Sequence, residues 1–449
     1  MSDYSNAIRL AIFTVAIYVA AQTVGLRLLY YLAYVLFAVL LAAFLWAQFS
    51  KRGLRVRRSV EPAQAQVGGT VQETIEIENL SWLRKLWLEV RDRSTLPGHH
   101  VGAVVSLKGR AAKRWRVRTL CTHRGLYRLG PTAILTGDPF GLFMTGRVFD
   151  TGAELLVYPA IVPLQSFGLP SGELPGGGRT ERRSFHSTPN AAGIREYLPG
   201  DAMNRIHWPV SARTQKLMVK EFELDPTADL WLILDLHAGV HVAANDHASQ
   251  DDSYEPRPRA GWLPGLARDG GASAGADLHQ AGPIPLDPTT EEYSVAVAAS
   301  LAAYFLSQGK SVGMIAWGQH RVTLPADRGG RQLTKILRAL AVLRAEGNMP
   351  LGQVLAAEQR LFGKQDTLVV VTPSLADEWV QSLQAQLFRV ASAATVIVEP
   401  GTFGGGGNPL LTVSALSALN VPSYMVKRDD ALDAALRQQF GGPAVRNLR

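Results

Sequence analysis

Leu28–Phe49 reads LLYYLAYVLFAVLLAAFLWAQF, and this apolar segment decides how the chain begins to fold. Among its 22 residues only Gln48 is strongly polar. A helix rises about 1.5 Å per residue, so the segment reaches roughly 33 Å and could cross the hydrocarbon core of a bilayer. Aromatic residues concentrate towards its two ends, as they do at membrane interfaces: Tyr30, Tyr31, Tyr34 and Trp46. We therefore expect a membrane-spanning helix.

A second apolar segment, Ile8–Val24, precedes the first and reaches roughly 26 Å as a helix. The three residues between the two segments leave room only for a tight turn. We therefore expect residues 1–50 to form an antiparallel hairpin of two spanning helices, about 8–24 and 28–49.

Basic residues flank this hairpin unequally. Its turn contains Arg27 alone, whereas five basic residues follow the second helix: Lys51, Arg52, Arg55, Arg57 and Arg58. Cytoplasmic flanks accumulate Lys and Arg, so we expect a two-pass plasma-membrane protein with both termini and its body in the cytoplasm. The competing interpretation is a signal peptide cut near residues 20–21. It is disfavoured because the residues before the apolar run carry no net positive charge and a second run follows at once.

The net charge of +8 also lies mostly beside the hairpin, because residues 1–58 account for +6 of it. The remaining 391 residues carry only +2, which argues against nucleic acid as a partner. The single cysteine, Cys121, excludes a disulfide framework within the chain and a cysteine zinc cluster.

Residues 54–160 show the two-residue period of β-strands, with turn residues between the strands. Apolar and polar side chains alternate along 71–78 and again along 114–118. We expect a β-sandwich-like domain. Its arginines at 114, 116 and 118 then form either the solvated face of a strand or a face that lies against anionic lipid headgroups.

Residues 161–228 begin as a Gly- and Pro-rich linker, and residues 229–449 alternate short apolar runs with helical segments. Such runs are typical of strands in an open parallel α/β sheet: 230–234, 312–317, 367–371, 395–398 and 424–426. Thr289 and Glu292 form a capping box at the start of one helix. Residues 239–288 lack periodicity, which indicates a flexible insertion.

Familiar catalytic motifs are incomplete in this chain. Gly309-Lys310-Ser311 resembles the end of a phosphate-binding loop, but Tyr304 occupies the upstream glycine position and the helix precedes the strand. His237 and His241 have metalloprotease spacing without the glutamate. The sequence contains no G-x-S-x-G elbow. We expect no catalytic residues and no cofactor.

Residues 195–223 form the densest polar cluster, R-E-Y-x-P-G-D-x-x-x-R-I-x-W-x-x-S-A-R-x-x-x-L-x-V-K-E-F-E. One interpretation is structural: Asp201 caps a short helix and pairs with Arg195 or Arg205, and Trp208 packs beneath them. The alternative is a membrane-bound enzyme in which Asp201 and His207 act as acid or base beside Arg195.

This cluster closely resembles the signature of the family named domain of unknown function 58, as do the segments 124–131 and 138–143 and the paired-helix anchor. Its signature positions, with a structural or partner-binding role, are Arg195, Tyr197, Pro199, Gly200, Asp201, Arg205, Trp208, Ser211, Arg213, Lys220, Glu221 and Glu223. Members are membrane proteins of bacteria and archaea. The resemblance implies a multi-domain fold: the hairpin, a β-sandwich-like domain, then a sheet similar to the von Willebrand factor A domain.

The resemblance also implies partners, namely AAA+ ATPases of the MoxR class and in some cases transglutaminase-like membrane proteins. A metal-binding von Willebrand factor A domain presents D-x-S-x-S after its first strand. Here Asp235 is followed by His237 and Gly239, and Thr372 occupies a position that is often acidic. We therefore expect Asp235 to cap a loop and to be at most a vestigial metal ligand. The function expected is a non-enzymatic, membrane-anchored scaffold that docks a partner.

Overall fold

The computed structural model describes residues 4–169, 191–197, 206–222, 229–244 and 286–440, without the side chains of 191–195 and 220–222. Two compact units divide the chain. Unit 1 comprises residues 1–160 with 248–287, and unit 2 comprises 161–247 with 288–449.

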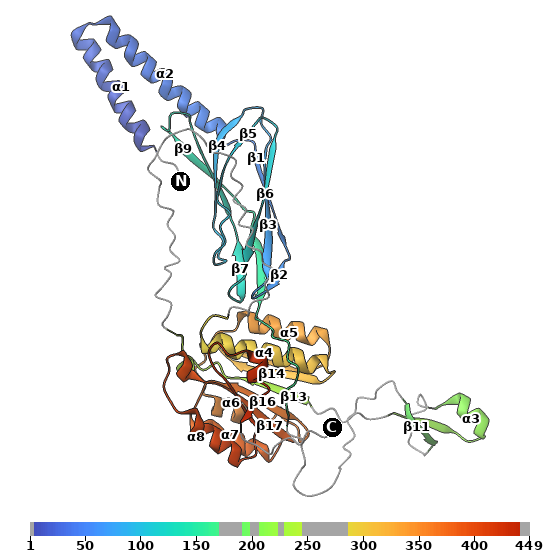
Figure 1. Cartoon of the computed structure of the whole chain (residues 1–449). Helices are drawn as coiled ribbons and strands as arrows, with labels where there is room; N and C mark the ends of the chain where they lie inside the picture. Colours follow the sequence, from blue (N-terminus) through green and yellow to red (C-terminus); the bar gives the residue numbers. More distant parts are fainter. Residues whose placement is uncertain (1–3, 170–190, 198–205, 223–228, 245–285, 441–449) are drawn as a thin grey trace. The chain divides into compact units, whose positions relative to one another are not determined.

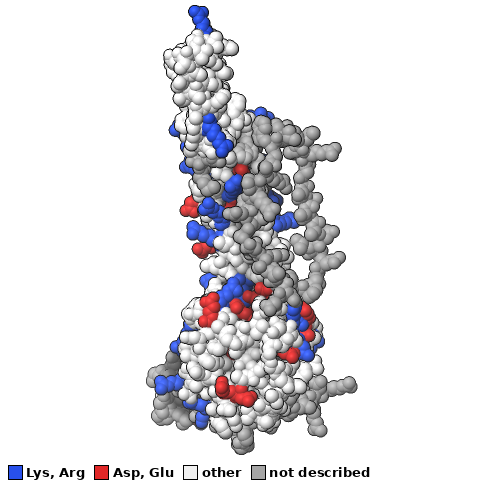
Figure 2. Space-filling view, turned by 90° about the vertical axis from the view of Figure 1, so that its left-hand side faces the viewer, with Lys and Arg blue, Asp and Glu red and all other residues white. Residues whose placement is uncertain are grey.

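Unit 1 begins with a helical hairpin of α1 (Ser5–Val24) and α2 (Arg27–Ser50), which lie side by side (Figure 1). Its large apolar side chains face outward; Leu28 is 75% and Ile12 65% exposed. In Figure 2 its visible surface is almost free of charged side chains below a basic tip. A core helix of a soluble protein would bury such residues. Both helices are therefore long and apolar enough to cross a membrane, with their apolar surface available to lipid.

Three small sheets follow the hairpin in the described part of unit 1. The first contains β1 (Leu54–Glu61), β3 (Thr70–Asn79) and β6 (Ala112–Leu120). The second contains β5 (Ala103–Leu107), β4 (Lys85–Asp92), β8 (Thr132–Gly137) and β9 (Met144–Phe149). The third contains β2 (Gln64–Gln66), β10 (Ala153–Tyr158) and β7 (Gly125–Leu129). The first two share one core, because alternate residues of each sheet are apolar and buried between them, Ile75 and Ile77 from β3 and Leu88 and Val90 from β4.

The arginines of β6 take the exposed positions of that strand while Trp115 and Val117 pack on the core. Arg114 pairs with Glu76 of the neighbouring strand at 3.3 Å. This exposure is compatible with both expectations for these arginines, a solvated strand face and a face against lipid headgroups.

Unit 2 is built on a seven-stranded sheet in the order β15-β14-β13-β16-β17-β18-β19. Five strands are parallel, and each contains a predicted apolar run: β13 (Asp229–Leu234), β14 (Ser311–Trp317), β16 (Thr367–Thr372), β17 (Ser392–Val398) and β18 (Ser423–Val426). The sheet is not wholly parallel as expected. Antiparallel strands β15 (Arg321–Asp327) and β19 (Gln439–Phe440) close its two edges.

Helices cover both faces of this sheet (Figure 1). One face carries α4 (Thr290–Ser307) and α5 (Gly330–Val342). The other carries α6 (Leu351–Ala357), α7 (Asp377–Leu387) and α8 (Pro409–Ala418), whose apolar residues join one core with Ile233 and Val370 of the sheet. Helix α4 begins at the predicted cap, where Thr289 Oγ1 accepts a hydrogen bond from the Glu292 N–H at 3.1 Å. The short helix α9 (Leu432–Ala435) contacts β18.

The predicted linker is partly a packed element. We name residues 161–169 the strap, because its backbone is hydrogen-bonded to the rest of unit 2 at four points. One of these bonds joins the Gln165 N–H to Asp433 Oδ1 at 3.0 Å. The Val162 N–H donates to Ser300 Oγ at 2.9 Å and the Phe167 N–H to the Tyr304 hydroxyl at 3.2 Å. The Tyr424 hydroxyl donates to the Gly168 carbonyl at 2.6 Å.

A flexible insertion was expected over residues 239–288, but both ends of this segment take part in the fold of unit 2. A 3-10 turn, Ala238–Val240, follows β13, and Ala243 forms a β-bridge with Thr289. Residues 245–285 lie outside the described part of the chain.

Candidate functional site

The carboxyl edge of the unit 2 sheet contains a topological switch point. Strand β13 lies at the centre, and its parallel neighbours β14 and β16 lie on opposite sides of it. The connections after β13 and β16 therefore leave in different directions, and ligands of open α/β sheets bind at such crevices. Asp235 follows β13, and Thr372 ends β16.

Asp235 is buried, with 4% of its surface exposed, and it joins the two strand ends. Its Oδ1 accepts a hydrogen bond from the His237 N–H at 3.1 Å, and its Oδ2 accepts one from the Thr372 hydroxyl at 2.6 Å. Thr372 Oγ1 in turn accepts from the Ser374 N–H at 2.9 Å. The prediction that Asp235 caps the loop after its strand is confirmed.

Burial raises the pKa of Asp235 above its ordinary value, because a charged carboxylate loses solvation inside the protein. The hydrogen bonds from Thr372 and His237 act in the opposite direction. His241 is fixed nearby, with its Nε2 3.0 Å from the Asp235 carbonyl oxygen.

A pocket of about 380 Å³ opens beside Asp235. Helix α6 contributes Gln353 and Ala356 to its wall, and α7 contributes Glu378. His237 lines it as well, and its buried Nδ1 has no hydrogen-bond partner within the described part of the chain. The pocket thus combines apolar helix surfaces with a few polar groups, as sites for ligands and peptides do.

The donor set at this edge does not fit a divalent metal ion. Mg²⁺ requires several oxygen ligands in octahedral geometry, whereas both oxygens of Asp235 already accept protein hydrogen bonds. The positions of the two expected serines hold His237 and Gly239. Across the described ranges, no group of three or more His, Cys, Asp or Glu residues gathers to hold a metal.

Part of the signature cluster forms a second site in unit 2, a hairpin of β11 (Ala191–Glu196) and β12 (Met218–Phe222) that encloses the short helix α3 (Trp208–Thr214). Ser211 fixes the helix to the strand. Its hydroxyl donates to the His207 carbonyl at 3.1 Å and accepts from the Met218 N–H at 2.8 Å. His207 caps the helix, because its Nδ1 accepts from the Val210 N–H at 3.3 Å.

One expectation for this cluster is wrong, and another lies outside the described residues. The expected cap of a short helix by Asp201 falls on residues that are not described, and the described helix α3 is capped by His207. Trp208 is 65% exposed, so it does not pack beneath an ion-pair cluster. Trp208 is the first residue of the helix.

The remaining signature residues are only partly described. Tyr197 is half-buried, Arg213 is exposed, and Glu196 pairs with Lys216 at 3.1 Å on the surface. Outside the described residues lie Pro199, Gly200, Asp201, Arg205 and Glu223, together with the side chains of Arg195, Lys220 and Glu221.

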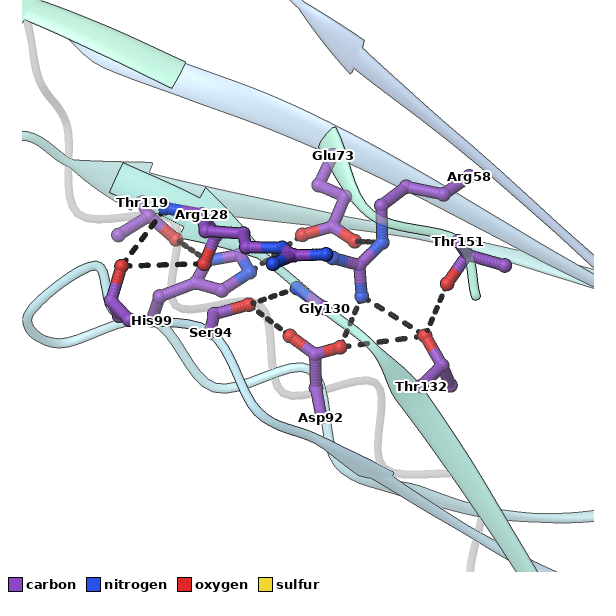
Figure 3. A network of polar contacts seen from close by, with 11 residues as sticks. Arg58, Glu73, Asp92, Ser94, His99, Thr119, Arg128, Gly130, Thr132 and Thr151 are labelled. Atoms are coloured by element: carbon purple, nitrogen blue, oxygen red, sulfur yellow. Dashed lines mark hydrogen bonds and ion pairs between the residues drawn. The ribbon is translucent and has the colours of Figure 1, made fainter. Parts of the chain in front are cut away.

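Unit 1 contains a buried ionic network that sequence reasoning missed (Figure 3). Arg58 Nε lies 2.8 Å from Glu73 Oε1, and the same guanidinium binds Asp92. His99 Nε2 lies 2.5 Å from Glu73 Oε2, and its Nδ1 lies 2.7 Å from Thr119 Oγ1. The side chains of all four ionisable residues are less than 5% exposed.

This network fastens β1 to β3 and to the segment after β4. Gly130 makes room for it, because a Cβ at this position would lie 2.9 Å from Arg58 Nη1, and its φ of +90° disfavours other residues. The network also corrects the charge count after the hairpin. Arg58 is an internal ion-pair partner, and Arg55 pairs with Glu78 at 3.6 Å, so neither is a free membrane-flanking cation.

Known proteins match this chain in two ways. The model of the family described as "Protein of unknown function DUF58" matches residues 193–251. "Uncharacterized protein YeaD" of Bacillus subtilis (strain 168) is 24% identical over 389 residues, which cover 82% of each protein.

Matches to solved structures are weak. A CARDB domain from Pyrococcus furiosus is 17% identical with a TM-score of 0.18, over 23% of this chain and 91% of that domain. Proximal thread matrix protein 1 of the mussel byssus is 10% identical with a TM-score of 0.27, over 47% of this chain and 46% of that protein. Scores this low carry no inference about fold or function.

Proposed function

This chain belongs to the DUF58 family, and we propose that it is a membrane-anchored docking protein without enzymatic activity of its own. Its hairpin holds it in the plasma membrane, with both termini and both units in the cytoplasm. The α/β unit receives the partner.

The strand order of unit 2 supports its assignment to the von Willebrand factor A type. In that architecture the first strand is central, the next two strands lie to one side with an antiparallel edge, and the later strands lie to the other. The order β15-β14-β13-β16-β17-β18 has this arrangement. Fold alone does not determine function, so the site carries the argument.

The observation that carries the proposal is the pocket at the carboxyl edge beside Asp235. Its polar centre is held by internal hydrogen bonds to Thr372 and His237, and a carboxylate so engaged is poorly placed for acid–base chemistry. Exposed leucines at the start of α8, Leu410 and Leu411, add an apolar surface to unit 2. Preformed pockets with apolar surroundings are typical of sites that bind another protein.

The partner we propose is an AAA+ ATPase of the MoxR class, which works on assemblies at the cytoplasmic membrane face. A transglutaminase-like membrane protein is a further partner of the same assembly. The family resemblance supports both, and the cytoplasmic placement of unit 2 would make it accessible to a soluble ATPase.

Co-purification of the full chain from detergent with the cognate ATPase, with and without nucleotide, tests this proposal. Ala356→Arg introduces a long charged side chain at the pocket wall, and we expect it to reduce recovery of the ATPase at least tenfold. Ala357→Arg is the matched control, because Ala357 is the next residue of α6, is also exposed and does not line the pocket. Equal recovery with both variants, or no recovery with the unmodified chain, would refute docking at this pocket.

A further inference from the structure

We propose that unit 1 contacts the lipid headgroup layer through a set of exposed apolar residues, here named the collar: Leu80, Trp82, Leu86, Trp87 and Phe140. The proposal rests on the membrane anchor of the proposed function. It adds a second, peripheral contact between the protein and lipid.

The collar lies at the end of unit 1 to which the hairpin is attached. Lys85, between two collar residues, donates from Nζ to the carbonyl oxygen of Phe49 in the last turn of α2 at 2.8 Å. The Leu80 N–H donates to the carbonyl oxygen of Gly53 at 2.7 Å. Residues 80–87, which include four of the five collar residues, are therefore fixed to the end of the second spanning helix.

The other collar segment is the turn between β8 and β9, which also contacts the hairpin. The ring of Phe143 packs edge-on against Phe44 of α2 at 5.6 Å and against Tyr4, just before α1, at 5.9 Å between centroids. Spanning helices end at the membrane surface, so residues tied to those ends lie at headgroup depth.

The local structure displays the collar side chains rather than burying them. Trp82 is 82% and Phe140 62% exposed. The backbone beneath Trp82 is nevertheless well ordered, because the buried Asn79 donates from Nδ2 to the carbonyl oxygens of Leu83 and Lys108 at 2.9 and 3.0 Å. An exposed tryptophan on a fixed loop is typical of a contact surface.

Two further devices turn apolar residues outward. In the β4–β5 pairing the register shifts between Lys85 and Leu88, so Leu86 and Trp87 form a bulge and both are exposed. In the β8–β9 turn, Asp138 accepts from the Phe140 N–H at 2.8 Å and from the Phe143 N–H at 2.6 Å. This leaves Phe140 exposed while Phe143 packs on the hairpin.

Charge favours lipid over a protein as the occupant. Five basic residues that are not buried lie within segments 49–53, 80–87, 108–111 and 138–143: Lys51, Arg52, Arg84, Lys108 and Arg110. The sixth, Lys85, is buried. The only acidic residue in these segments is Asp138, whose oxygens are engaged in the turn. Interfacial tryptophans beside cations fit an anionic headgroup layer.

Site-specific fluorescence on the full chain in vesicles tests the collar. Trp82→Cys and Phe140→Cys would each be labelled with bimane, and Leu126→Cys is the control. Leu126 is 57% exposed, a fraction similar to the 62% of Phe140. It lies on β7, away from the hairpin in Figure 1. The native Cys121 is fully buried and should not take the label.

The vesicles would contain phosphatidylcholine and phosphatidylglycerol, with lipids spin-labelled either near the headgroup or deep in the acyl chain. We expect the label at 82 and 140 to be quenched at least threefold more than at 126, and more by the shallow quencher than by the deep one. Arg84→Glu with Lys108→Glu should halve the quenching at 82. Equal quenching at 82, 140 and 126 would overturn the proposal.

Flotation of the same vesicles separates this proposal from the anchor on which it rests. If the chain floats with the vesicles but the label at 82 and 140 is not quenched, the membrane anchor is supported and the collar proposal is refuted. A chain that does not float at all refutes the anchor, and the collar with it.

Discussion

Asp235 and Thr372 show how two residues hold the carboxyl edge of the sheet together. The change Thr372→Val keeps the shape of the side chain and removes the hydroxyl that donates to Asp235 Oδ2 at 2.6 Å. A buried carboxylate then loses one of its donors, so we expect the free energy of unfolding to fall by about 1–3 kcal/mol. Urea denaturation of the detergent-solubilised chain measures this. An unchanged midpoint would show that solvent reaches Asp235.

The raised pKa of Asp235 makes the stability of unit 2 depend on pH. Because the folded state binds the proton more tightly than the unfolded state, stability falls as pH rises from the ordinary value of 3.8 through the raised pKa. Asp235→Asn removes the titrating group, so it should flatten this slope. Urea midpoints measured over this pH range for both proteins provide the check, and identical slopes would contradict it.

Arg58 is the central cation of the buried network in unit 1. Arg58→Met removes the guanidinium from two buried carboxylates, which leaves Glu73 with His99 and Asp92 with hydroxyl groups alone. Breaking a buried ion pair costs about 3–5 kcal/mol. Arg55→Met is the control, because Arg55 lies on the same strand with a half-exposed side chain and a 3.6 Å pair to Glu78; we expect at most about 1 kcal/mol there. Similar losses for the two variants would contradict the burial of this network.

At the scale of elements, Lys85 links β4 to the end of α2. Burial lowers the pKa of Lys85. Its ammonium group donates to the Phe49 carbonyl oxygen in the last helical turn, which also accepts from the Arg52 N–H at 3.2 Å. Lys85→Met keeps the apolar stem and removes this bond. We expect amide hydrogen exchange in the last turn of α2 to accelerate about tenfold, with no change at the Gly25 turn. Unchanged exchange would mean that the turn is held by other contacts.

The elements that sequence predicted well are those whose signal is local. Continuous apolar runs identified the five parallel strands because both faces of such strands are buried. The edge strand β15 escaped notice, since only one of its sides pairs and its residues are mixed in polarity. The strap was taken for a linker because its partners, Ser300 and Tyr424, lie far along the chain.

The sites were harder to predict than the fold, because most of their contacts join residues that are far apart in the sequence. Arg58 looks like a membrane-flanking cation until Glu73, Asp92 and His99 surround it. The cap on α3 depends on which side chain reaches the Val210 N–H, and the sequence did not indicate that His207 would. Asp235 was correctly predicted because its partner, His237, is two residues away.

At the scale of the whole molecule, the proposed orientation follows from charge at the two ends of the hairpin. Arg27 is the one basic residue at its tip, whereas five basic residues that are not buried lie around the collar. We expect alkaline phosphatase fused after Arg449 to be inactive and green fluorescent protein fused at the same position to fluoresce, as cytoplasmic fusions do. An active phosphatase fusion would reverse the topology and exclude a cytoplasmic ATPase as partner.

The contacts of the strap can be completed only late in translation. Gly168 meets Tyr424, 256 residues further on, so its docking site does not exist until most of the protein has left the ribosome. At about 5–20 residues per second, that wait is roughly 13 to 50 s. The hairpin and the sheets of unit 1 are complete well before then. Phe167 packs against Phe305 and Tyr424, so its full set of aromatic contacts also forms only once residue 424 has been made.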